Sequence, residues 1–80
     1  MITPKEAEKL ATKHVQEYVN ACGAENLEDI GKVLLKLLSV TGQAILATQG
    51  QETAVAMLEG TAKHLAKPEF SKPYRMSVLQ

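Results

Sequence analysis

Three side chains in the sequence could support nucleophilic, acid–base or metal-binding chemistry: Cys22, His14 and His64. Cys22 follows His14 by more than two helical turns, so the two cannot form a nucleophile–base pair within one helix. A zinc site needs three or four ligands at suitable spacing, and these three residues fall on different predicted elements. We therefore predict no metal site, no cofactor and no catalytic residues.

Each histidine also has a purely structural interpretation. His14 falls on the apolar stripe of the first predicted helix, and His64 falls at the edge of the apolar face of the third. A half-buried imidazole bonded to a backbone carbonyl or a tyrosine hydroxyl would account for both. The motifs GxxxxGK[ST], GxGxxG, GxSxG and HExxH are all absent. The sequence therefore predicts a protein that is not an enzyme.

Charge and cysteine content limit the classes of partner. Among the 80 residues, 9 Lys and Arg balance 9 Asp and Glu, so no net field attracts nucleic acid or an anionic membrane. The single cysteine excludes an internal disulfide and fits a reducing compartment. The N-terminal segment MITPKEAEKLATKH carries charges where a signal peptide would be apolar. We expect a soluble cytoplasmic protein without membrane association.

Local signals predict three helices in residues 1–67. Thr3, Pro4 and Glu6 form a capping-box pattern that begins a helix over about 4–21, and Gly23 stops it. Asn26 can cap a second helix over about 27–48. Gly50 separates this from a third helix over about 52–66, which ends before Pro68. Short connections favour antiparallel neighbours, so the predicted fold is all-α, with an up-down-up arrangement.

The helical period assigns an apolar face to each helix. On the first helix this face contains Ala7, Leu10, Ala11, His14, Val15, Tyr18 and Cys22. On the third helix it contains Ala54, Val55, Leu58, Thr61, Ala62 and Leu65. The second helix is apolar or small over roughly 220° of its circumference. Two neighbouring helices cannot cover such a wide surface, so we predict assembly into a homo-oligomeric helical bundle, most simply a dimer.

Within the second helix, a candidate packing strip consists of Gly31, Leu35, Leu38 and Gly42. Its glycines have no side chains to keep another backbone away, and a helical glycine costs about 0.5–1 kcal/mol relative to alanine. Close packing would compensate for that cost. The strip could admit a helix of the same chain, or it could form the contact across a two-fold axis.

Residues 68–80 are predicted to form an extended C-terminal arm, because Pro68 and Pro73 prevent a continuing helix. Its candidate contact residues are Phe70, Tyr74, Met76, Val78 and Leu79. These side chains are too apolar for a tail that remains fully solvated. The arm could pack on its own helices, on a second subunit or on a different protein.

Two functions remain. The favoured one is a small helical protein that self-associates and binds an unidentified protein partner as an adaptor, inhibitor or regulator. The alternative is a small DNA-associated transcriptional regulator, since the segment LATQGQETAVAML superficially resembles a helix-turn-helix. Its second helix would present Gln51, Glu52 and Thr53 to the groove, without Lys or Arg in the first two turns. Nucleic-acid binding is therefore the less favoured prediction.

Overall fold

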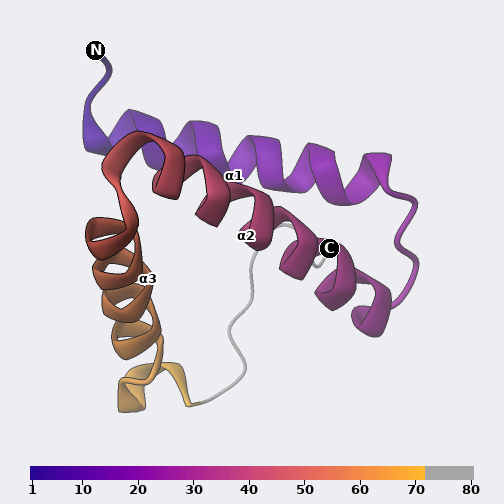
Figure 1. Cartoon of the computed structure of the whole chain (residues 1–80). Coiled ribbons are helices and arrows are strands. Elements are labelled where there is room, and N and C mark those ends of the chain that lie inside the picture. Colours follow the sequence, from indigo (N-terminus) through magenta and orange to yellow (C-terminus); the bar gives the residue numbers. More distant parts are fainter. Residues whose placement is uncertain (72–80) are drawn as a thin grey trace. The chain divides into compact units, whose positions relative to one another are not determined.

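The computed structural model describes residues 1–71, which contain three α-helices and no strand. The helices are α1 (Pro4–Ala21), α2 (Leu27–Gln49) and α3 (Gln51–Leu65), followed by the short 3-10 helix η1 (Pro68–Phe70) (Figure 1). The prediction of an all-α protein is confirmed for this part of the chain. Of the predicted arm contacts, Phe70 lies in η1, and the remaining four lie outside the described residues: Tyr74, Met76, Val78 and Leu79.

The described chain divides into two compact units, and the boundary falls inside α2. Residues 1–34 form the first unit, and residues 35–71 belong to the second. Each unit therefore contains one complete long helix and a part of α2.

In the first unit, hydrogen bonds made by side chains fix the starts of both helices. The Thr3 hydroxyl accepts a bond from the Glu6 amide at 3.2 Å, and a Glu6 carboxylate oxygen accepts one from the Thr3 amide at 3.2 Å. The bonds from the Thr3 side chain and backbone lower the pKa of Glu6. At α2, the Asn26 side-chain oxygen accepts from the Asp29 amide at 2.9 Å. Both caps satisfy amides that a helix start would leave unpaired.

A tertiary hydrogen bond connects α1 to the beginning of α2. The Tyr18 hydroxyl donates to the Val33 carbonyl oxygen at 2.8 Å, and Val19, beside it, is only 3% exposed. The best-covered residues of α1 are Thr12, Val15, Gln16, Tyr18 and Val19.

The predicted apolar face of α1 is therefore wrong for its N-terminal part, where Ala7, Leu10 and Ala11 are all exposed. Val15 and Tyr18, which also belong to that face, are partly covered. The pattern of apolar residues does not encode the Tyr18 hydrogen bond, and it did not include Val19, the buried residue of α1.

In the second unit, a single residue separates two helices. Gly50 has φ 87° and ψ 163°, its amide donates to the Leu46 carbonyl at 3.0 Å, and its own carbonyl accepts from the Ala54 amide at 2.9 Å. This backbone conformation is accessible essentially only to glycine. The residue thus ends α2 and begins α3 without any further linker.

Burial in α3 is much smaller than the sequence predicts. Ala54 is 4% exposed, but Leu58 remains 38% exposed and Leu65 61%. No residue of α2 is buried. The predicted inward face of α3 is therefore wrong apart from Ala54, because an apolar face is buried only if a second layer covers it.

The Tyr18 hydrogen bond gives a first prediction. Replacement Tyr18→Phe should lower the melting temperature by about 5 °C, because the bond to the Val33 carbonyl is lost while the ring remains. The control Thr12→Val should change it little, because the Thr12 hydroxyl bonds to the Glu8 carbonyl within its own helix.

The difference in melting temperature between wild type and Tyr18→Phe should depend on pH. Desolvation, together with the neighbouring Cys22 thiol, raises the pKa of Tyr18 above its ordinary value of 10.0. The protonated hydroxyl is thus favoured in the folded chain, and its contribution is present below pH 10 and lost as the pH rises through the folded-state pKa. The difference in melting temperature between wild type and Tyr18→Phe should shrink there, and a constant difference would refute this role.

Two glycines should respond to alanine in opposite directions. Gly50→Ala should destabilise the protein by about 1–3 kcal/mol, because its backbone lies in a region that side chains disfavour. Gly60→Ala should stabilise it by about 0.5–1 kcal/mol, because Gly60 is inside α3 and a methyl group there would meet no atom within 4 Å. Urea denaturation measures both, and a stabilising Gly50→Ala would contradict the conformation described.

Candidate functional site: an apolar groove between α2 and α3

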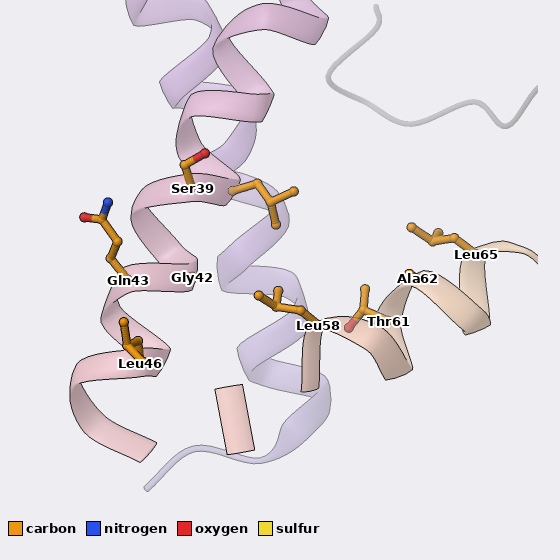
Figure 2. Close-up of a pocket in the computed structure, with 9 residues that line it drawn as sticks. Ser39, Gly42, Gln43, Leu46, Leu58, Thr61, Ala62 and Leu65 are labelled. Carbon is orange, nitrogen blue, oxygen red and sulfur yellow. The ribbon is translucent and has the colours of Figure 1, made fainter. Parts of the chain in front are cut away.

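An apolar groove lies within the second unit of the described chain, between α2 and α3 (Figure 2). We call it the α2–α3 groove. It has a volume of about 520 Å³ and is lined by Leu38, Ser39, Gly42, Gln43, Leu46, Leu58, Thr61, Ala62 and Leu65. None of these side chains is ionisable. The groove is suited to an apolar occupant rather than to a charged one.

Gly42 of α2 faces Leu58 of α3 in this groove. A Cβ atom added at Gly42 would lie 3.7 Å from the Leu58 Cδ1 atom, and Figure 2 shows Leu58 pointing from α3 toward α2 at this level. An alanine methyl group at this position would thus make an ordinary van der Waals contact with Leu58. The interpretation that the glycine serves to admit a helix of the same chain stays a prediction.

The other residues of the candidate packing strip remain open. A methyl group added at Gly31 would meet nothing within 4 Å, and Leu35 and Leu38 are 64% and 53% exposed. Leu38 lines the α2–α3 groove, and Leu35 shares its side of α2 by the helical period. A contact of the strip across a two-fold axis remains a prediction.

The polar groups of the α2–α3 groove are mostly satisfied within their own helices. The Ser39 hydroxyl donates to the Leu35 carbonyl at 3.0 Å, and the Thr61 hydroxyl donates to the Met57 carbonyl at 3.0 Å. Covering these hydroxyls would therefore strand no donor. A site for a small polar ligand normally directs several free polar groups at one point, which is not the arrangement of these hydroxyls.

The residues with reactive side chains make separate local contacts within the described chain. The His14 Nδ1 atom lies 3.4 Å from a Glu17 carboxylate oxygen on an exposed part of α1, and Cys22 is exposed. The His64 ring packs edge-on against Phe70 with centroids 5.1 Å apart. Both histidines are exposed, so the expectation that they are half-buried is wrong. Residues 1–71 contain no group of three His, Cys, Asp or Glu side chains that could hold a metal ion.

α2 is also long and apolar enough to cross a membrane. It has 23 residues, its most apolar window has a mean hydropathy of 1.5, and none of that window is buried. Core helices of soluble proteins and signal sequences meet the same criterion, so one such helix is only a weak indication. Its N-terminal half carries Lys32 and Lys36, which would be costly in a bilayer centre.

Sequence reasoning identified some of the groove residues but not the groove. Leu38 and Gly42 belong to the predicted strip, and Leu58, Thr61, Ala62 and Leu65 belong to the predicted face of α3. It missed Ser39, Gln43 and Leu46. The spacing of Leu46, four residues after Gly42 on the same side of α2, was the available signal.

Comparison of the chain with protein-family models, curated proteins and solved structures finds no match.

The contact between Gly42 and Leu58 predicts a difference between two leucine substitutions. Gly42→Leu should destabilise the protein by about 1–3 kcal/mol, because its Cβ atom would already contact Leu58 and the larger side chain would have to displace Leu58 or leave its preferred rotamer. Ala56→Leu adds the same side chain to an exposed position on α3 and should have an effect within about 0.5 kcal/mol. Equal stabilities in urea denaturation would show that Gly42 is not a close-packing position.

Proposed function

We propose that this chain is a small non-enzymatic helical protein that self-associates and acts by binding another protein, as an adaptor, inhibitor or regulator. One observation supports it above all: large apolar side chains stay exposed on both helices of the second unit. Among the described residues, the buried hydrophobic side chains are Val19 and Ala54. A chain of 80 residues is near the lower limit for a self-sufficient core, so a second subunit would supply the missing cover.

The exposed leucines of the α2–α3 groove indicate the strength of such an association. Leu38, Leu46, Leu58 and Leu65 are 53%, 48%, 38% and 61% exposed. Together they amount to about two fully exposed leucine side chains, whose burial would contribute about 3–6 kcal/mol per copy. Association itself costs about 4–15 kcal/mol. The groove of two copies thus supports at most micromolar affinity, and other exposed apolar residues would have to add to it for tighter binding.

The proposed location is the cytoplasm. The exposed single Cys22 suits a reducing compartment, and the lysines of α2 are better accommodated in water than in lipid. The first turn of α3 contains Glu52 and no basic residue, which gives no support to DNA binding by this helix. We therefore place the proposed function among protein-binding proteins.

Light scattering tests the self-association. The monomer has a mass of 8.7 kDa, and we expect about twice that mass for the wild-type protein in the upper micromolar range. The fraction of dimer should fall on dilution, as mass action requires. A monomeric mass throughout the micromolar range would exclude self-association.

The binding of another protein is tested separately by affinity capture from the native host. A protein partner retained by the wild-type chain and identified by mass spectrometry would support it. Retention of duplex DNA in a salt-dependent manner, without a protein partner, would replace it with the DNA-associated alternative.

A further inference from the structure

We propose that the α2–α3 groove is the self-association surface, and that its occupant is the α2–α3 groove of a second copy related by a two-fold axis. This inference rests on the proposed self-association and specifies its surface. In such an interface the same residues meet from both sides, so the surface must be compatible with itself.

Charge makes the α2–α3 groove compatible with itself. None of its nine lining residues is ionisable, so the lining itself brings no like charges together across a two-fold axis. A surface of one sign would repel its symmetry mate. The uncharged lining also means that binding should depend little on ionic strength.

The hydroxyl groups of the α2–α3 groove are hydrogen-bonded in a way that allows water to be excluded from it on association. The Ser39 and Thr61 hydroxyls already donate to the Leu35 and Met57 carbonyls of their own helices. A second copy would cover them without leaving a buried donor unpaired. Gln43 is exposed beside Ser39 on the groove side of α2, where its amide can reach its symmetry mate or water. A small polar ligand would gain little orientation from these groups, which favours a protein occupant over such a ligand.

The shape of the surface provides both the cavity and the side chains to fill it. Gly42 leaves the middle of α2 without a side chain, and leucines stand on either side of it at Leu38 and Leu46. Leu35 extends the same side of α2 by one turn and is 64% exposed. The leucines beside the groove of one copy could therefore enter the groove of the other copy.

The second copy is also an occupant that is available to every folded chain. Ala54 is the one buried hydrophobic residue within the described part of the second unit, so burying more of this unit's apolar surface would stabilise it. A second copy is present wherever the chain is present. An occasional partner would leave the same leucines in water for the rest of the time.

Two charge-introducing substitutions on α2 test the surface. Leu38→Glu places a carboxylate in the groove, whereas Val40→Glu places one about 200° around the same helix, at a residue of similar exposure, 56% against 53%. Leu38→Glu should raise the dimer dissociation constant at least about tenfold, and Val40→Glu should change it less than about twofold. Circular dichroism confirms that each variant remains helical. A dimer unaffected by Leu38→Glu, or one disrupted equally by both variants, would overturn the inference.

Disulfide trapping gives an independent test that does not depend on weakening the protein. In a Cys22→Ser background, single cysteines are introduced by Ser39→Cys and Gln43→Cys in the groove and by Val40→Cys as the control. Oxidised glutathione should link two copies through position 39 or 43 faster than through position 40. Preferential linkage through position 40 would overturn the inference.

The outcomes separate the two proposals. A wild-type monomer rejects the proposed self-association and this inference together. A wild-type dimer that is indifferent to Leu38→Glu rejects the α2–α3 groove alone and leaves self-association in place. Dissociation constants that are equal at low and high salt would agree with the uncharged groove, whereas strong weakening by salt would contradict it.

Discussion

Covering the apolar surface of α2 is the constraint on which the rest of this structure depends. The helix is 23 residues long, and it contains no buried residue. α1 contacts its beginning through the Tyr18 hydrogen bond, and α3 approaches its later part where Leu58 faces Gly42. These contacts hold the helices in two local units, but they leave leucines exposed along α2. The proposed association follows from these exposed leucines of α2 rather than from any reactive group.

Local signals allowed the helices to be predicted from sequence. The capping box of Thr3 and Glu6, the cap at Asn26 and the glycines at 23 and 50 act through neighbouring backbone groups, and the structure contains each of them. Such interactions depend on a few adjacent residues, so a sequence pattern is enough to recognise them. The all-α class followed from the same signals.

Packing was harder to predict because it depends on contacts between elements. The period of α1 indicated an inward face from Ala7 to Cys22, yet the buried residue, Val19, is not part of that face. The face of α3 was recognised as apolar, but its burial was overestimated because no single-chain pattern states whether a second layer is present. The α2–α3 groove combines residues from both helices, so it could be recognised only when Gly42 and Leu58 were placed together.

Gly50 controls the angle between the two helices of the second unit. Because Gly50 alone joins α2 to α3, its two backbone torsions determine the angle between the helices. No further linker residue is present that could compensate for a change in these torsions. With φ at 87°, these torsions lie in a region of backbone conformation that is essentially restricted to glycine. The width of the α2–α3 groove is thus set at a hinge outside its lining. A residue inserted at this hinge would alter which shapes fit the groove while leaving every residue that lines it unchanged.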